Sequence, residues 1–280
     1  MVGLGAGVAT PSSTDHSEAH SLREAWTAVR ARLGLVALLL LLAGLAWWAT
    51  ANQMAGMDVG PGTDLGAAGW FVALWVVMMA AMMFPSVAPT VALYARMTRQ
   101  RSAVRPLLFT AAYLVVWGLV GLLSYGVFQG GKALLGRQLA WDAAGRWLAA
   151  GVLLTAALYE LTPLKNACLT KCRSALGFLL GNWRDGARGG VEMGAKHAAW
   201  CVGCCWALMA GLFALGVMSL IWMAVIAAII AAEKTLPWRR TVVWGTTALL
   251  VILAVMVAVA PHSLPGLVIP GSPSGMRMVS

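Results

Sequence analysis

The stretch Val191-Glu-Met-Gly-Ala-Lys-His-Ala-Ala-Trp-Cys-Val-Gly-Cys-Cys-Trp206 begins a long apolar segment with polar and sulfur-bearing side chains. Taken as the first turns of a membrane-spanning helix, it places His197, Cys201, Cys204 and Cys205 within one arc of roughly 100°. One helix face therefore carries thiols and an imidazole. Sulfur ligands with imidazole suit Cu(I), Zn(II) or iron–sulfur chemistry, and polar groups at membrane depth are candidates for function.

The composition predicts an all-α protein whose main solvent is lipid. The 280 residues are 60% hydrophobic and 11% charged, with a mean hydropathy of +0.79. Soluble domains do not need this balance, whereas a polytopic transmembrane helix bundle does. Apolar runs that can cross a ~30 Å hydrocarbon core predict seven spans, although the turn between the fifth and sixth is weak. The ranges are 33–50, 70–94, 107–128, 147–163, 195–213, 217–232 and 241–260.

Lysine and arginine are distributed unevenly between the segments that join these spans. Of the 20, 15 lie before the first span or between the second and third, the fourth and fifth, or the sixth and seventh spans. Four lie in the remaining segments, and Lys196 lies in the fifth span. Because short cytoplasmic loops retain positive charge, the amino terminus is predicted to be cytoplasmic and the carboxyl terminus external. The predicted parts are a polar tail over 1–32, a metal-binding bundle over 33–260 and an external tail over 261–280, in a bacterial inner membrane. The net charge of +10 is assigned to loops that face anionic lipid rather than to nucleic acid.

The five cysteines predict thiols rather than a disulfide framework, since the number is odd and none is expected outside. Cys168 and Cys172 fall in a predicted basic loop on the cytoplasmic side, a reducing compartment. Their CxxxC spacing puts both thiols on one face if the loop is helical, and the neighbouring cations favour thiolates. Free cysteine also packs as a small hydrophobe, so packing is the alternative interpretation.

The second span carries four methionines over an arc near 140°, and thioethers at this spacing can ligate Cu(I). Methionine is also ordinary core filler. The second span runs inward and the fifth outward, so the two sulfur clusters are predicted to share a depth. Pro85 and Pro89 follow the methionines, and each can kink the helix, either opening a cavity or causing no functional change. The methionines are Met78, Met79, Met82 and Met83.

Two further groups are weaker candidates. Glu160, at the inner end of the fourth span, is predicted to pair with Lys165 or another loop cation. On the outer side, Met54, Met57 and Asp58 would supply soft and acidic ligands. Together with the loop cysteines, the outer methionines would place metal-binding groups at both mouths of the bundle.

Three stretches carry a resemblance: Met78-Met79-Ala-Ala-Met82-Met83-Phe-Pro85-Ser-Val-Ala-Pro89, Tyr159-Glu-Leu-Thr-Pro163-Leu-Lys165 running into Cys168-Leu-Thr-Lys-Cys172-Arg173, and His197 through Cys201 and Cys204 to Cys205-Trp206-Ala-Leu-Met209. Over roughly 70–240 the chain resembles the DUF2182 group of bacterial integral membrane proteins, whose better-understood relatives are proposed copper chaperones serving a tyrosinase-type oxidase. The resemblance implies metal handling in the membrane.

The sequence therefore predicts a membrane protein that binds Cu(I) through Cys201, Cys204, Cys205 and His197 with the four methionines, and exchanges it through Cys168 and Cys172. The expected role is copper trafficking, either delivery to a cuproenzyme client or export, with a metallochaperone as a further partner and zinc as the alternative metal. A thiol oxidoreductase, in which Cys204-Cys205 and the loop cysteines exchange electrons, is a competing interpretation. A structural subunit with packed cysteines is another. A carrier is favoured over an enzyme.

Overall fold

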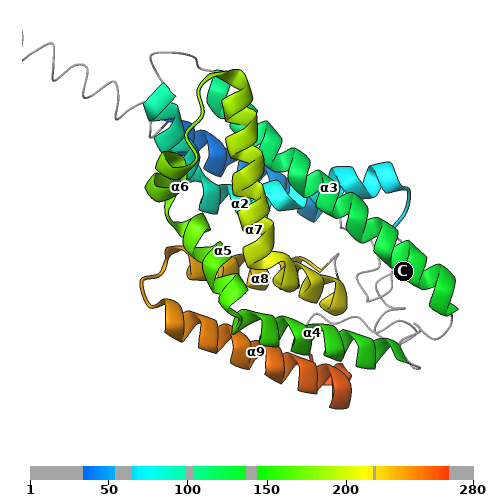
Figure 1. Ribbon diagram of the computed structural model, residues 1–280. Helices are drawn as coiled ribbons and strands as arrows, with labels where there is room; N and C mark the ends of the chain where they lie inside the picture. The colour runs from blue at the N-terminus through cyan, green and yellow to red at the C-terminus, as the bar shows by residue number, and fades with distance from the viewer. Residues whose placement is uncertain (1–33, 54–64, 99–103, 137–143, 217–218, 265–280) are drawn as a thin grey trace, which may run out of the picture.

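The computed structural model describes residues 34–53, 65–98, 104–136, 144–216 and 219–264, and within these ranges the regular structure is helical (Figure 1). The prediction of an all-α fold is confirmed. The helices are Gly34–Gln53, α2 (Ala68–Thr98), α3 (Val104–Leu135), α4 (Arg146–Glu160), α5 (Pro163–Arg173), α6 (Ala175–Gly181), α7 (Gly186–Leu215), α8 (Leu220–Thr235), α9 (Arg239–Val259) and the short 3-10 turn η3 (Pro261–Ser263).

The predicted number of seven spans is wrong. Five helices are long and apolar enough to cross a membrane, namely Gly34–Gln53, α2, α3, α7 and α9, and the pair α4 and α5, bent by 68°, would make six. With 15 and 16 residues, α4 and α8 reach only about 22 and 24 Å at 1.5 Å per residue. Pro163 disfavours helical backbone at Thr162 and ends α4 early, and a glycine with φ of 107°, Gly216, separates α8 from α7. The fifth and sixth apolar runs are thus two separate helices.

Large apolar side chains cover the outer faces of several helices. On α3, for example, Leu119, Leu123 and Val127 are all more than half exposed. A soluble monomer rarely exposes contiguous apolar surface of this kind, whereas lipid accommodates it. Helix length and outward-facing composition together support a membrane protein.

Helices α3 and α7 run in the same direction and pack closely through small residues. Gly190 of α7 lies against the carbonyl oxygen of Arg105, and one turn later Gly194 lies directly against the carbonyl of Phe109. Glycines spaced by four residues let two helix backbones approach within a membrane. This close contact brings the α3 side chain Tyr113 to the sulfur of Cys201.

Helix α2 runs antiparallel to α7. At one end the rings of Trp75 and Phe213 lie 5.6 Å apart, and at the other the Tyr94 hydroxyl lies beside Gly190. The middle of α2, which holds the four buried methionines, is therefore level with the cysteines of α7. The predicted common depth of the two sulfur clusters agrees with this register, and α2 continues as one helix through both of its prolines.

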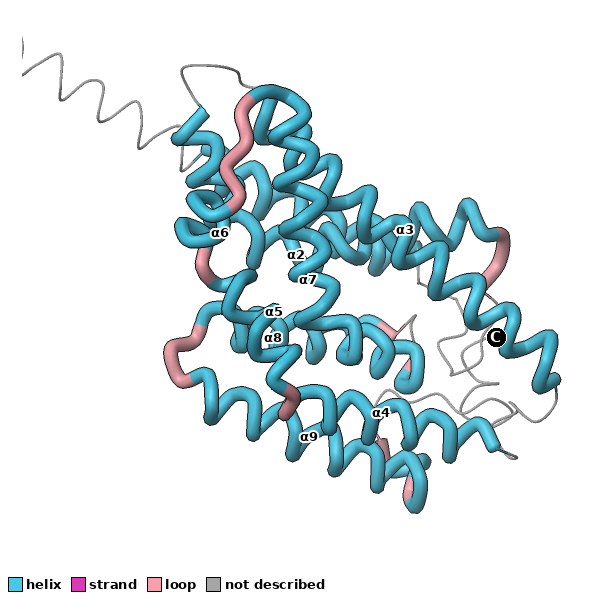
Figure 2. The backbone as a smooth tube through the Cα atoms, in the orientation of Figure 1, coloured by secondary structure: helices cyan, strands magenta, loops and turns pink. Residues whose placement is uncertain are grey.

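The three short helices α4, α5 and α6 together follow α7 from its carboxyl end to its amino end. Leu153 of α4 contacts Gly211, Tyr159 donates a hydrogen bond to the carbonyl of Gly203, and Phe178 of α6 packs on His197. Thr162 caps α5 and Ser174 caps α6, so the breaks have partners for their backbone groups. Figure 2 shows these breaks as short loops beside α7. Helix α5 is thereby held against the cysteine-bearing turns of α7.

Candidate metal site

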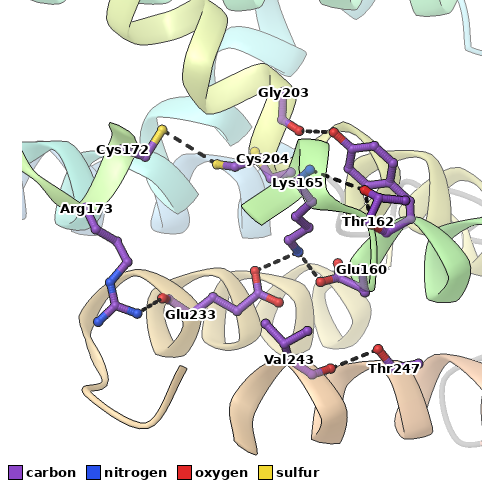
Figure 3. Close-up of polar contacts among 12 residues, drawn as sticks. Glu160, Thr162, Lys165, Cys172, Arg173, Gly203, Cys204, Glu233, Val243 and Thr247 are labelled. Atoms are coloured by element: carbon purple, nitrogen blue, oxygen red, sulfur yellow. Dashed lines mark hydrogen bonds and ion pairs between the residues drawn. The ribbon is translucent and has the colours of Figure 1, made fainter. Parts of the chain in front are cut away.

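Three buried thiols from two helices meet beside α7. Cys201 and Cys204 lie one turn apart on α7, and Cys172 comes from α5; their sulfur atoms all lie within 4.8 Å of one another. The Sγ atoms of Cys204 and Cys172 are 3.7 Å apart (Figure 3). Three sulfurs bound to one ion at about 2.3 Å would lie about 4 Å apart in a trigonal plane. The trio therefore needs little movement to hold one soft metal ion.

Helix α5 is fixed in this position by two basic side chains. The Arg173 guanidinium donates to the carbonyl oxygens of Glu233 and Leu236 at 2.7 and 2.6 Å, which caps the carboxyl end of α8. The Lys165 ammonium is buried and reaches the carboxylates of both Glu160 and Glu233, the latter at 2.8 Å (Figure 3). The predicted pairing of Glu160 with Lys165 is confirmed. One ion-pair cluster thus joins α4, α5 and α8 directly below the thiols.

The hydrogen bonds around the thiols distinguish Cys201 from its neighbours. Cys204 and Cys205 each direct a thiol at the backbone carbonyl of Cys201, at 3.1 and 2.8 Å. The sulfur of Cys201 instead lies 3.1 Å from the Lys234 ammonium and 3.1 Å from the Tyr113 hydroxyl. Because an ammonium only donates, the Cys201 sulfur accepts from Lys234. The ammonium would thus compensate the negative charge of a thiolate at Cys201.

Three predicted ligands lie near the trio without joining it. His197, one turn before Cys201, is buried among Phe109, Tyr113 and Phe178, and its Nδ1 atom has no hydrogen-bond partner. The other two are Cys168, whose sulfur lies against Gly203, and Cys205, which bonds to the backbone of its own helix.

The predicted loop cysteines and the predicted methionine ligands differ in how well the structure agrees with their predicted positions. Cys168 and Cys172, predicted in a cytoplasmic loop, instead lie buried in α5, because the nearby cations that indicated a loop are neutralised or used as a helix cap. Of the methionines, Met83 reaches the site, since its sulfur lies 3.9 Å from the Lys234 ammonium. Met54 and Met57 lie outside the described residues.

Sequence reasoning missed Lys234, Glu233 and Tyr113 as parts of the site. The two charged residues follow directly after the apolar run 217–232, and the hydropathy pattern therefore predicts that they lie in a loop. Their position at the end of an apolar helix was a usable signal, because charges there pair with one another or with functional groups. Tyr113 gave no signal, since a tyrosine in an apolar helix is unremarkable until its partner is known.

The fold and the site define a class: a bundle of apolar helices that encloses a cluster of cysteine sulfurs able to hold a metal ion. The PpoB2 family, described as a copper chaperone, matches residues 72–257, and the chain belongs to this family. The match covers α3 and α7 completely and includes all the cysteines. It supports a copper-chaperone family without bearing on the DUF2182 name. No curated protein and no solved structure matches the chain.

Proposed function

We propose that this protein binds one Cu(I) ion within the membrane through Cys172, Cys201 and Cys204, and passes the ion to a cuproenzyme client at or beyond the membrane. The observation that carries the proposal is the convergence of three buried thiols from α5 and α7. Cu(I) prefers soft thiolate ligands and accepts low coordination numbers, so three sulfurs suffice. Membership of a copper-chaperone family supports copper over zinc.

The break between α4 and α5 supports exchange of the ion rather than permanent storage. Cys172 sits on α5, which joins α4 through a 68° bend, whereas Cys201 and Cys204 sit on the long helix α7. A small movement of α5 would separate one ligand from the other two and lower the affinity of the site. Membrane transporters likewise form their substrate and ion sites from interrupted helices.

Metal analysis of the purified protein tests the proposal. The wild type, in detergent and under reducing conditions, is expected to bind about one Cu(I) with high affinity. Cys172→Ser and Cys204→Ser should each weaken binding by more than the 10–100-fold typical of outer-shell changes, because each removes a ligand. Cys205→Ser is the matched control, since Cys205 is equally buried on the same helix but its sulfur does not belong to the three-thiol cluster. If all three variants bind copper like the wild type, the thiol site is not the copper site.

A thiol oxidoreductase is the second candidate, and the 3.7 Å approach of the Cys172 and Cys204 sulfurs favours it. Two thiols at this distance can form a disulfide, releasing two protons and two electrons to a quinone or another disulfide. The two functions separate experimentally. An oxidoreductase would cycle between dithiol and disulfide during turnover in metal-free membranes, whereas a copper carrier would keep both thiols reduced.

A further inference from the structure

The ammonium of Lys234 lies among donor atoms from two other helices. Its Nζ atom is 3.1 Å from the sulfur of Cys201 on α7, 3.3 Å from the hydroxyl of Ser86 and 3.9 Å from the sulfur of Met83, both on α2. Lys234 itself belongs to α8. A tethered cation thus fills a position that two sulfurs and an oxygen surround.

The direction of the hydrogen bonds shows that these neighbours face the ammonium with lone pairs. A lysine ammonium has three donors and no acceptor, so each neighbour accepts from it. The Ser86 hydroxyl donates its hydrogen bond to the carbonyl oxygen of Met83, at 2.8 Å. Its oxygen lone pairs therefore remain available to accept from Lys234. Met83 is fully buried, and its thioether is a weak acceptor for a proton but a good ligand for a soft ion.

We propose that Lys234 occupies a second Cu(I) position, formed by the Cys201 and Met83 sulfurs, and that the metal ion and the ammonium compete for it. This inference rests on the proposed function and deepens it. A thiolate and a thioether are both soft ligands, and a hard ammonium holds such a pair only weakly. Copper can therefore displace the ammonium, and the ammonium, tethered close by, can return and expel the copper.

The position of Cys201 links this site to the trio. Cys201 belongs to the three-thiol cluster and also contacts Lys234, so its sulfur can bridge the two positions. An ion entering beside Met83 could move to the trio without leaving sulfur ligands. Lys234 would then restore the charge balance at the position that the ion left.

Competition predicts that removing the ammonium strengthens metal binding. Lys234→Met keeps the length of the side chain and removes its charge, and Lys234→Leu removes the charge without adding a sulfur. Both full-length variants should bind a second Cu(I) at least about tenfold more tightly than the wild type. A gain confined to Lys234→Met would come from its new thioether and would count against competition by the ammonium. Lys234→Arg keeps the charge and should not show this gain. Stoichiometry and affinity are measured by titrating Cu(I) against a chromophoric chelator, with Ag(I) as a redox-inert substitute.

A pair of methionine variants locates the gained ion. Met83→Leu in the Lys234→Met background should abolish the gain, because leucine conserves volume without a sulfur. Met78→Leu should preserve it, since Met78 is equally buried on α2 and lies toward its amino end. The same pair in the wild-type background, at saturating Cu(I), keeps Lys234 in place and shows whether the weaker second ion depends on Met83.

The outcomes separate this inference from the proposed function. Unchanged stoichiometry and affinity in Lys234→Met, or a gain that survives Met83→Leu, would overturn the second position while leaving copper in the trio intact. Loss of the first ion in Cys172→Ser, without effect on the Lys234→Met gain, would support both sites. Copper binding that never depends on Cys172 or Cys204 would refute the proposed function, whatever Lys234→Met shows.

Discussion

Lys165 is a fully buried lysine that lies between two buried carboxylates, those of Glu160 and Glu233. Neither carboxylate would remain stably ionised there alone, since burial removes the water that solvates a charge. The cluster therefore constrains where α5 sits relative to α4 and α8. It does so by orientation rather than by net stabilisation, because well-packed apolar side chains often replace such clusters without loss.

Lys165→Met is expected to destabilise the protein by about 3–5 kcal/mol, because it leaves two buried carboxylates without their cation. Replacing all three charges, by adding Glu160→Leu and Glu233→Leu, should recover most of the loss. Unfolding by denaturing detergent, followed by helical circular dichroism, measures both.

The exposed pair Arg184 and Glu192, 2.9 Å apart with side chains 58% and 46% exposed, provides the control. Arg184→Met should change the free energy of unfolding by no more than about 1 kcal/mol, because solvated ion pairs contribute little. Equal losses at Lys165 and Arg184 would show that burial does not set the importance of the Lys165 cluster.

At the scale of elements, the glycine contacts of α7 decide how closely it approaches α3. A β-carbon on Gly194 would overlap the backbone of Phe109, and that backbone cannot move aside as a side chain could. The contact between Tyr113 and Cys201 lies about one turn further along α3 and two turns further along α7. The spacing of α3 and α7 therefore reaches the metal site directly.

Gly194→Ala is expected to lower both stability and copper affinity, because it forces α7 away from α3. In a free helix the same change would stabilise by about 1 kcal/mol. Gly245→Ala in α9 is the matched control, since a β-carbon there meets nothing within 4 Å. Thermal unfolding and chelator competition on both variants measure the effect, and equal behaviour of the two would contradict a role for close packing.

The apolar runs located the helices well, since every predicted span overlaps one. They could not show which runs end too soon to cross a bilayer, because a proline or glycine break changes the helix length without changing the hydropathy. The spacing of the cysteines along α7 was enough to predict that Cys201 and Cys204 share one helix face. That Cys172 lies beside them depends on the tertiary position of α5, which the spacing does not show. Lys234 and Glu233 were hidden for the same reason: their partners lie on other helices.

For the whole molecule, the path of the chain bears on its orientation in the membrane. Helices α3 and α7 are parallel, so the chain must return across the bundle between them, and α4, α5 and α6 provide that passage along α7. Helix α8 then brings the chain from the carboxyl end of α7 back to Lys234, at the depth of the site. Figure 1 shows α9 lying beside α4 and ending near the first turns of α4.

This path predicts that the end of α9 and the end of α3 lie on the same side of the membrane, opposite the turn between α2 and α3. A count of six crossing helices would instead put the end of α9 on the side of the amino terminus. The arginines around the α2–α3 connection, Arg96 and Arg105 among them, predict that this connection is cytoplasmic. Reporter fusions after Thr98, Gly136 and Leu264 distinguish the alternatives. The fusion after Thr98 should be active only with a reporter that works inside, and the fusions after Gly136 and Leu264 only with one that works outside. An inside signal at Leu264 would mean that α9 crosses in the opposite direction, and that its pairing with α4 does not hold in the membrane.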